Sequence, residues 1–467
     1  MKHTKTRTFA PVWDKDFIEK NNSSGPRYTS YPTAMAFHEE LSEQDYHDAA
    51  HRSNNKQRPL SLYLHLPFCN TICYYCACNK IVTADRKKSR HYLDQLIREL
   101  SLQGALFDHN RPVVQLHWGG GTPTFFSHPE MTELMYHIGR NFNLLHDQAG
   151  EYSIEIDPRD ADLNTLSLIH GLGFNRISLG VQDFNEKVQQ AINRIQPYAM
   201  VAEVFKQARN LGFASISTDL IYGLPYQSPE TYQKTIDQIL NLQPDRISLF
   251  NYAHLPHRFK TQRQIQEEAL PSANNKLEIL CDTANTLTQA GYIHIGMDHF
   301  AKQDDSLVLA QQQGQLQRNF QGYSVAREAD LVGMGVSAIG HIDNIYSQNF
   351  KSIRLYEEAL LSNHLPIERG YILNADDLLR QDIINQITCH NGINIKSIEQ
   401  KHSITFADYF SQELTKLRQC EEEGLIEIST TQIQLTSLGR LVIRRICMIF
   451  DIYTVTNEES KRYSRIL

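Results

Sequence analysis

Four cysteines are crowded into the segment FCNTICYYCACNK, residues 68–80. They are Cys69, Cys73, Cys76 and Cys78, and their spacing is C-x3-C-x2-C-x-C. Structural zinc sites usually combine two cysteine pairs across a longer loop, whereas all four thiols here share one short loop. Three thiolates on such a loop can hold three irons of a 4Fe–4S cluster and leave the fourth iron open, whereas ferredoxins close every iron with cysteine. An open iron can bind a small chelating ligand, so the spacing predicts a cluster that does chemistry.

The composition predicts a soluble, cytoplasmic protein with a sizeable core. Of 467 residues, 41% are hydrophobic, which suffices for two or three domains or for one large barrel with additions. The N-terminus lacks the apolar core of a secretory signal, and Arg444 and Arg445 interrupt the most apolar late stretch. A reducing cytoplasm disfavours disulfides. The remaining cysteines are expected to be buried apolar residues, and they are Cys281, Cys389, Cys420 and Cys447.

The charge of the chain is uneven. Its net charge of −7 argues against a general nucleic-acid binder. The first thirty residues differ, because they hold six basic and three acidic residues. They are either a solvated basic tail or an arm that covers an anionic ligand.

Short β-rich runs alternate with amphipathic helical stretches between about residues 60 and 300. This alternation predicts a parallel α/β sheet. One helix is expected to follow Ser89 as its N-cap, another to follow the capping box at residues 127–130, and a third to begin near Pro229. The expected strands are residues 61–66, 113–118, 152–157, 176–181, 215–221, 246–252 and 293–297.

Polar residues gather at or just past the C-terminal ends of the expected strands. In a parallel sheet that edge is where ligands bind. Polar groups after six successive strands therefore predict one shared site. These groups are Cys69, residues 119–121, Glu155, Asp157, Gln182, Asp183, Asp219 and residues 251–254.

The pattern changes past residue 300. The glutamine-rich segment 310–323 is expected to be a loop, and from about residue 371 helical stretches precede a hairpin at residues 426–435 and a further helix. This end resembles a small winged-helix-like module, and without a basic face it is expected to be a lid or docking unit rather than a DNA reader. The predicted domains are residues 1–50 as arm and lead-in, 51–350 as the central domain and 351–467 as the C-terminal domain.

The cysteine loop resembles the signature of the radical S-adenosylmethionine (SAM) superfamily, in which an aromatic residue, here Tyr75, precedes the last cysteine of C-x3-C-x2-C at the end of a strand. The resemblance implies that Cys69, Cys73 and Cys76 ligate a 4Fe–4S cluster, that Cys78 does not, and that SAM chelates the open iron. It also implies an α/β fold with a partial (β/α)6-type radical SAM barrel, an N-terminal arm and a smaller, mainly helical C-terminal domain.

Neighbouring residues suit the same ligand. The segment HWGGGTPT, residues 117–124, lets backbone amides approach the amino-acid end of SAM, or it is merely a tight turn. Glu155 and Asp219 either accept hydrogen bonds from ribose hydroxyls or are paired carboxylates at the edge of the sheet.

Ten segments in order resemble the oxygen-independent coproporphyrinogen III oxidases (dehydrogenases) of anaerobic haem biosynthesis. The resemblance implies that a 5′-deoxyadenosyl radical abstracts hydrogen from two propionates of coproporphyrinogen III, which lose carbon dioxide and become the vinyl groups of protoporphyrinogen IX. The segments are SGPRYTSYPTA, HLPFCNTICYYCACNKIVT, QLHWGGGTPT, IEIDPR, GFNRISLGVQDFN, DLIYGLP, FNYAHLP, GMDHFA, RNFQGY and GMGVSAI.

The same resemblance implies two SAM molecules per chain and the residues that bind them. Cys78 and Glu155 are the expected catalytic residues. Tyr75 stands where the family often has phenylalanine, and Arg194 either pairs with a SAM carboxylate or is a surface arginine. The residues expected around the cluster-bound SAM are Tyr63, Gly120, Glu155 and Ile339. Those expected around the second SAM are Tyr75, Gly121, Thr122, Gln182, Arg194, Asp219 and Ala253.

Two other functions stay open. A haem chaperone of the same superfamily would bind haem without decarboxylation, although such chaperones lack the fourth cysteine and the arm motif, present here as Cys78 and residues 24–32. A radical SAM methyltransferase that opens the haem ring would give methylated products. Histidines could be taken for metal or haem ligands, although packing is the simpler interpretation, and they are His65, His117, His254 and His299.

The expected partners follow from the resemblance. They are a tetrapyrrole substrate, whose four carboxylates fit a basic arm, a low-potential electron donor such as flavodoxin or ferredoxin, and an unidentified electron acceptor. No nucleic acid and no membrane are expected, and the chain is expected to be a monomer.

Overall fold

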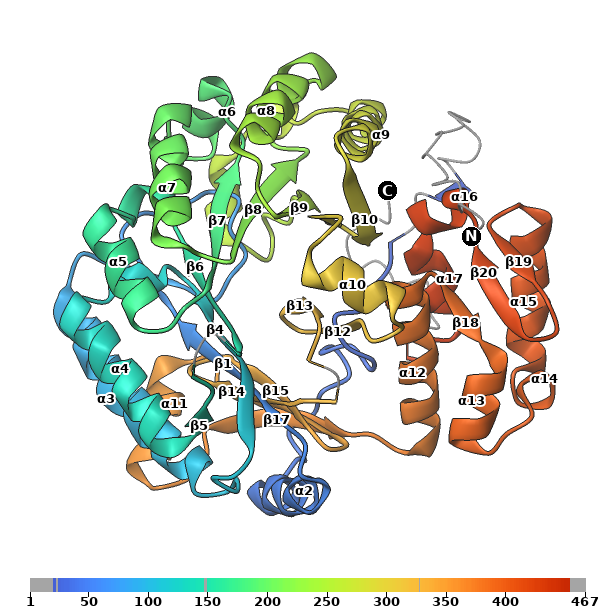
Figure 1. The fold of residues 1–467 in the computed structure, drawn as a ribbon, viewed down its shortest axis with the longest axis horizontal. Helices are drawn as coiled ribbons and strands as arrows, with labels where there is room; N and C mark the ends of the chain where they lie inside the picture. The colour runs from blue at the N-terminus through green and yellow to red at the C-terminus, as the bar shows by residue number, and fades with distance from the viewer. Residues whose placement is uncertain (1–19, 22–23, 147–148, 327, 454–467) are drawn as a thin grey trace. The chain divides into compact units, whose positions relative to one another are not determined.

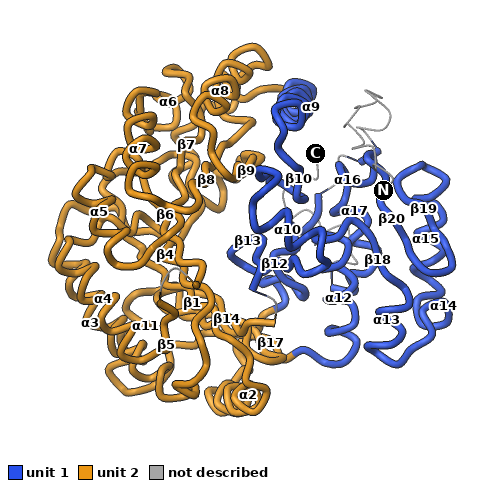
Figure 2. The backbone as a smooth tube through the Cα atoms, in the orientation of Figure 1, with its two compact units in different colours: residues 1–36, 273–327, 373–467 blue, residues 37–272, 328–372 orange. Residues whose placement is uncertain are grey.

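The computed structural model describes residues 20–21, 24–146, 149–326 and 328–453. The chain divides into two compact units, each made of separate segments (Figure 2). Unit 1 comprises residues 1–36, 273–327 and 373–467, and unit 2 comprises residues 37–272 and 328–372. The linear domain boundaries at residues 50 and 350 stay a prediction. Of the charged residues in the predicted basic arm, all except Lys20 and Arg27 lie outside the described residues.

Unit 2 contains the parallel sheet that the sequence predicts. Its strand order is β9-β8-β7-β6-β4-β1-β14, all parallel, and the antiparallel strands β15, β16 and β17 follow β14. Among the described strands of this unit, the pairing does not close into a ring. The parallel strands are β1 (Leu60–Leu66), β4 (Pro112–Gly120), β6 (Glu151–Ile156), β7 (Arg176–Gln182), β8 (Ser215–Tyr222), β9 (Arg246–Asn251) and β14 (Asp330–Met334). The others are β2 (Phe68–Cys69), β3 (Ile81–Val82), β5 (Asn143–Leu144), β15 (Ile339–Ile342), β16 (Ile345–Asn349) and β17 (Ile367–Ile372).

Helices follow the parallel strands and lie along the outer side of the sheet (Figure 1). The predicted capping box of Ser127 with Glu130 and the start at Pro229 are confirmed. The predicted N-cap Ser89 is wrong: Asp85 caps that helix, and Ser89 is buried within it. Both residues are good N-caps, and the polar first turn between them gave no apolar periodicity to mark the start. The helices are α2 (Glu43–Lys56), α3 (Arg86–Gly104), α4 (His128–Asn141), α5 (Leu163–Gly171), α6 (Glu186–Ala191), α7 (Tyr198–Leu211), α8 (Pro229–Leu242) and α11 (Ile353–Leu361).

The central strands have one apolar and one polar face. Along β6, buried Tyr152, Ile154 and Ile156 alternate with partly exposed residues, as side chains do on a pleated strand. The register aligns the polar positions of neighbouring strands, so they form one continuous polar face. Its members are His117, Glu151, Ser153, Glu155, Arg176, Ser178, Ser217 and Asp219.

Unit 1 contains the predicted seventh strand, but not as a parallel one. β10 (Tyr292–Gly296), after α9 (Ala273–Gln289), pairs antiparallel with β11 (His299–Lys302). The expectation of a further parallel strand is wrong because the chain reverses at Met297, whose φ is 47°, and no helix intervenes.

The rest of unit 1 is mainly helical, as predicted. The glutamine-rich segment is not a simple loop: α10 (Ser306–Gln312) ends in it, and β12 (Gln317–Asn319) pairs with β13 (Gly322–Ser324). The predicted C-terminal hairpin is confirmed as β19 (Ile426–Ile428) and β20 (Gln432–Leu435), with β18 (Gly392–Asn394) as a third strand. The remaining helices are α12 (Ala375–His390), α13 (Ile395–His402), α14 (Phe406–Tyr409), α15 (Ser411–Glu422), α16 (Ser437–Leu441) and α17 (Ile443–Ile449).

The described part of the N-terminal arm belongs to the core of unit 1. Tyr28 and Tyr31 are buried in the same hydrophobic cluster as α12 and α17. The Tyr28 hydroxyl donates to Asp451 over 2.9 Å, and Arg444 Nε donates to the carbonyl of Pro26 over 2.9 Å. Residues 24–32 are therefore a fixed part of this unit. Among the described helices, none joins the length to the apolar composition that a bilayer crossing demands.

A buried glutamate in α3 fastens the loop between β14 and β15. Glu99 has no exposed surface and accepts hydrogen bonds from the Gly335 amide (2.7 Å), Asn349 Nδ2 (2.7 Å) and the Tyr356 hydroxyl (2.6 Å). Gly335 has a φ of 96°, and a Cβ there would lie 2.6 Å from the His65 carbonyl oxygen, so the loop can pass this closely to β1 only with glycine.

Glu99 makes the stability of the protein depend on pH. Burial raises the pKa of Glu99 to about 7. A raised pKa in the folded state means that its stabilising contribution is complete below the ordinary pKa and is lost as pH rises through 7. Between pH 5 and 8 we expect the wild type to lose up to about 3 kcal/mol of unfolding free energy relative to Glu99→Gln. Urea unfolding at several pH values measures this difference, with the exposed-site variant Glu39→Gln as control. Parallel pH profiles for wild type and Glu99→Gln would contradict it.

Candidate active site

The loop that carries the four cysteines leaves and re-enters the protein at a pair of short strands. β2 and β3 pair in parallel, with Phe68 opposite Ile81 and Cys69 opposite Val82. The Thr83 amide donates to the Cys69 carbonyl over 3.1 Å. Both ends of the loop are thereby fixed next to the C-terminal end of β1.

Between these ends, three groups from other elements and the loop's own Lys80 hold carbonyl oxygens of the loop. The three groups from other elements come from β1, from the segment after α6 and from the 3-10 helix at Lys260–Gln264. The bonds are His65 Nε2 to Asn79 O (2.8 Å), Asn193 Nδ2 to Ile72 O (2.7 Å), Gln262 Nε2 to Tyr75 O (3.0 Å) and Lys80 Nζ to Cys76 O (2.9 Å). The loop conformation is therefore set mainly by long-range contacts, which the sequence pattern alone did not indicate.

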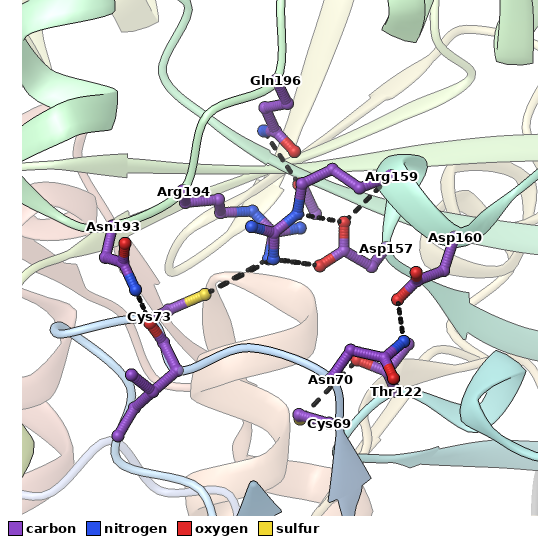
Figure 3. A network of polar contacts seen from close by, with 12 residues as sticks. Cys69, Asn70, Cys73, Thr122, Asp157, Arg159, Asp160, Asn193, Arg194 and Gln196 are labelled. Atoms are coloured by element: carbon purple, nitrogen blue, oxygen red, sulfur yellow. Dashed lines mark hydrogen bonds and ion pairs between the residues drawn. The ribbon is translucent and has the colours of Figure 1, made fainter. Parts of the chain in front are cut away.

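Hydrogen-bond donors point at two of the three predicted ligand sulfurs (Figure 3). Thr122 Oγ1 lies 3.6 Å from Cys69 Sγ, and Arg194 Nη1 lies 3.5 Å from Cys73 Sγ. A hydrogen bond from the exposed Cys78 lowers the pKa of Cys76 to about 6. Donors and cations favour thiolate over thiol, but at Cys69 burial outweighs the Thr122 donor and raises the pKa of the thiol to about 11. Three sulfurs on one loop, two of them with donors, fit an iron–sulfur cluster, whose irons would bind the thiolate forms.

Arg194 is part of a buried ion-pair network (Figure 3). It donates to Asp157 Oδ2 over 2.8 Å and to the Gly180 carbonyl over 2.6 Å, and Arg159 also pairs with Asp157. The interpretation of Arg194 as a surface arginine is wrong, because only 6% of it is exposed. Its expected contact with the second SAM stays a prediction. Sequence reasoning missed the partner, although Asp157 and Arg159 belong to the IEIDPR segment.

The three glycines at the end of β4 lie at close approaches, and two of them, Gly120 and Gly121, meet neighbours that leave no room for a side chain. A Cβ at Gly119 would lie 2.7 Å from Glu155 Oε1, one at Gly120 2.5 Å from His65, and one at Gly121 2.6 Å from the Phe68 carbonyl. Three amides of this segment donate within the protein: Gly120 to Glu155, Gly121 to Leu66 and Thr122 to Phe68. The expected approach of these amides to a ligand stays a prediction. The glycines bring β4 and the cysteine loop together.

Glu155 lies at the centre of the first predicted set. Its carboxylate accepts from His117 Nε2 (3.2 Å) and from the Gly120 amide (3.1 Å). Burial alone would raise the pKa of Glu155, but these hydrogen bonds outweigh it and lower the pKa. Its side chain is 43% exposed, so an ionised carboxylate is accessible on the polar face.

The other members of the first set lie close by. The Tyr63 ring stacks on His117 with centroids 5.8 Å apart, and its hydroxyl contacts His65 Nδ1 over 3.0 Å. Tyr63 pairs with Gly333 on β14, and a Cβ at Gly333 would lie 2.5 Å from the Ile339 carbonyl oxygen. The structure therefore brings Tyr63, Gly120, Glu155 and Ile339 together.

Several residues of the second predicted set are connected by strand pairing and by shared hydrogen-bond partners. Asp219 pairs with Gly180, whose carbonyl Arg194 holds, and Gln182 follows on the same strand with a strained φ of 67°. Gln262 Nε2 bridges the carbonyls of Tyr75 and Ala253, at 3.0 and 3.2 Å.

Asp219 differs in charge from Glu155. Burial, with a smaller contribution from the Glu155 carboxylate, raises the pKa of Asp219 to about 6. Two carboxyl groups with pKa values moved in opposite directions are a frequent mark of a functional site.

The histidines of this region are engaged by the protein. Burial lowers the pKa of His65, so the neutral ring donates from Nε2 to Asn79 and accepts from Tyr63 at Nδ1. His117 Nδ1 lies 2.6 Å from Ser153 Oγ, and His254 Nδ1 lies 2.8 Å from the Tyr252 hydroxyl. His299 packs its edge on the Tyr323 ring. Within the described ranges, no three His, Cys, Asp or Glu side chains are arranged to bind a single metal ion.

Comparison with known proteins places the chain among characterised relatives. Residues 63–239 match the family model of the radical SAM superfamily, and residues 373–442 match that of the HemN C-terminal domain. Two curated relatives carry the name oxygen-independent coproporphyrinogen III oxidase. The protein of Pseudomonas aeruginosa is 48% identical, covering 97% of this chain and 99% of its own length. That of Escherichia coli is 46% identical, covering 97% and 98%.

A solved structure agrees with these matches. The structure described as coproporphyrinogen III oxidase (HemN) from Escherichia coli, a radical SAM enzyme, superposes with a TM-score of 0.89 at 44% sequence identity. The alignment covers 94% of this chain and 99% of that one.

The ligand assignment predicts a specific loss of the cluster. Cys69→Ala removes one of three expected ligands, so we expect anaerobically reconstituted protein to lose most of its visible iron–sulfur absorption. Cys281→Ala, which removes a buried thiol of α9, is the matched control and should keep it. Iron and sulfide analysis checks both variants. A full cluster in Cys69→Ala would refute the assignment.

Proposed function

Because the chain belongs to the oxygen-independent coproporphyrinogen III oxidases, a family of radical SAM enzymes, we propose that it oxidatively decarboxylates two propionates of coproporphyrinogen III to give protoporphyrinogen IX. Each propionate loses one hydrogen atom, one carbon dioxide and one electron, and a vinyl group remains. The observation that carries this proposal is the similarity to named oxidases over nearly the entire chain together with the cysteine loop.

Radical SAM membership implies a 4Fe–4S cluster and SAM, which supply a 5′-deoxyadenosyl radical that removes the hydrogen atom. Cys69, Cys73 and Cys76 would hold the cluster. Two donors toward the sulfurs of Cys69 and Cys73 support this assignment. The number of SAM molecules, two per chain, is part of the proposal.

Glu155 and Asp219 would bind the two SAM molecules through different hydrogen bonds. Glu155 keeps its charge, since its pKa is lowered, and it can accept from two ribose hydroxyls or from an ammonium group. Asp219, whose pKa burial raises to about 6, is less firmly ionised and can donate when protonated. The two carboxyl groups on the polar face thus suit two copies of one cation in different positions.

Cys78 would act on the substrate rather than on the cluster. It is exposed, whereas Cys73 is buried, and it lies on the cysteine loop two residues after Cys76. A thiol in this position can exchange a proton or a hydrogen atom with a propionate side chain without leaving the loop.

Cations near the loop support a substrate with four carboxylates. Asn79 Nδ2 donates to the Lys351 carbonyl over 3.2 Å, so Lys351 lies beside the end of the cysteine loop. Burial, then the charge of Arg369 and to a smaller extent that of Arg258 lower the pKa of Lys351, while the Glu368 carboxylate opposes them. A further bound carboxylate would relieve the repulsion among these cations.

The remaining partners are also proposed. A low-potential carrier such as flavodoxin or ferredoxin would supply electrons, and an unidentified acceptor would remove them. All eight cysteines are free thiols, which suits a reducing cytoplasm. We propose that the chain acts there as a monomer.

An anaerobic assay tests the function. Protein with a reduced cluster, SAM and coproporphyrinogen III should give 5′-deoxyadenosine and a product lighter by two carbon dioxides and four hydrogen atoms, read by mass spectrometry. A haem chaperone would instead bind haem and give no decarboxylation, and a ring-opening methyltransferase would give methylated tetrapyrroles. Either result would overturn the proposal.

The role of Cys78 has its own test. Cys78→Ser should keep the cluster absorption and SAM cleavage but lower product formation by at least about a hundredfold, the usual size of a lost acid–base or hydrogen-donating group. Ala77→Ser adds the same hydroxyl at the neighbouring exposed position and should have little effect. Unchanged turnover in Cys78→Ser would make Cys78 structural.

A further inference from the structure

A basic segment follows the cysteine loop directly. Residues 80–90 contain five basic residues and one acidic residue, in a chain whose net charge is −7. They form β3 and the first turns of α3. Because Val82 pairs with Cys69 across β2 and β3, the segment begins immediately beside the first predicted cluster ligand.

The exposed side chains of this segment adjoin the exposed part of the cysteine loop. Arg86 Nη2 donates to Asn70 Oδ1 over 3.2 Å, and Asn70 lies between two predicted ligands in the chain. Val82, an apolar residue, is 40% exposed. We call this region the basic surface, and its exposed residues are Asn70, Thr71, Val82, Ala84, Asp85, Arg86, Lys87 and Lys88.

The cations at the start of α3 do not stabilise this helix. α3 has no acidic residue in its first turn, whereas α2, α4 and α12 each have at least one. Cations at the positive end of a helix cost about 0.3–1 kcal/mol each. Lys87 and Lys88 have no ion pair within the described part of the chain.

Among the described residues, nearby acids leave Lys87 and Lys88 without an ion-pair partner. Asp85 accepts from the Lys87 amide and Asp160 from Asn70, so both acids keep their charges, but neither of these described acids forms an ion pair with the two lysines. Asp94 and Glu133 both pair with Arg90. Two lysine charges therefore remain exposed beside the loop, and such fields speed the encounter with an oppositely charged protein.

We propose that the basic surface docks the acidic face of a small one-electron carrier protein, a flavodoxin or a ferredoxin, which reduces the cluster through the exposed stretch at residues 70–71. The inference rests on the proposed function, which needs such a donor. In each encounter the carrier loses one electron and the cluster gains one. Val82 adds an exposed apolar residue to the basic surface, and interfaces between proteins combine apolar contacts with a polar rim.

The double variant Lys87→Glu/Lys88→Glu tests the surface. Lys416→Glu/Arg418→Glu on α15 is the control, since it makes the same change in net charge at two exposed positions of unit 1. Stopped-flow absorbance follows cluster reduction by reduced flavodoxin, and a second series uses dithionite, which needs no docking surface. At low ionic strength we expect the Lys87/Lys88 variant to be reduced by flavodoxin at least about tenfold more slowly than wild type. With dithionite, all three proteins should react alike.

The outcomes separate the two proposals. Equal rates with flavodoxin for both double variants would overturn the docking surface. An equal loss of reduction rate with dithionite would also overturn it, because that result would mean that the two lysines are needed for an intact cluster rather than for docking. A flavodoxin rate in wild type that does not fall with added salt would exclude charge-guided docking. None of these readings needs the porphyrinogen, so absence of decarboxylated product alongside normal cluster reduction would refute only the proposed function.

Discussion

The loop between β2 and β3 is short and irregular, yet it must keep three sulfur atoms in fixed positions. A backbone without helix or sheet bonds would have many conformations, at an entropic cost of about 1–2 kcal/mol for each residue that is ordered. Here the cost is offset by side chains from distant segments: His65, Asn193 and Gln262 each bind one loop carbonyl. Since these groups stand on the sheet or on segments packed against it, the sheet determines the geometry of the sulfurs.

The polar face of the sheet is likewise determined by the alignment of its strands. The strand register places His117 beside Ser153 and Glu155 beside Ser178. Side chains two residues apart on each of these strands therefore lie on the same face of the sheet. At the N-terminal side of this face, Glu151 accepts from Gln115 and pairs with Arg176, which neutralises the charge there. Toward the C-terminal side Glu155 and Asp219 remain without a cationic lysine or arginine partner among their described contacts. The polar face therefore carries ion pairs on its N-terminal side and acidic side chains on its C-terminal side, next to the cysteine loop.

Sequence reasoning succeeded where a short-range rule decides the structure. The central strands, the capping box at Ser127 and the C-terminal hairpin all follow from periodicity or from neighbouring residues. It failed at Ser89, where two capping residues compete, and at β10, where one residue with positive φ reverses the chain. It also could not place Arg194 against Asp157 or find the engaged glycine amides, because such pairs depend on how separate strands are aligned.

These features give the cysteine loop two unlike sides. Donors from Thr122 and Arg194 address its sulfurs, while Asn70 and Thr71 are exposed on the chain between Cys69 and Cys73. A reaction that takes electrons from a protein and passes a reactive species to an organic substrate needs this separation, since water and carrier must be kept from the reacting carbon. If Cys69 and Cys73 ligate the cluster as predicted, an electron could arrive through residues 70–72 on the exposed side without opening the other. The spacing of the three cysteines would then serve electron entry as well as cluster binding.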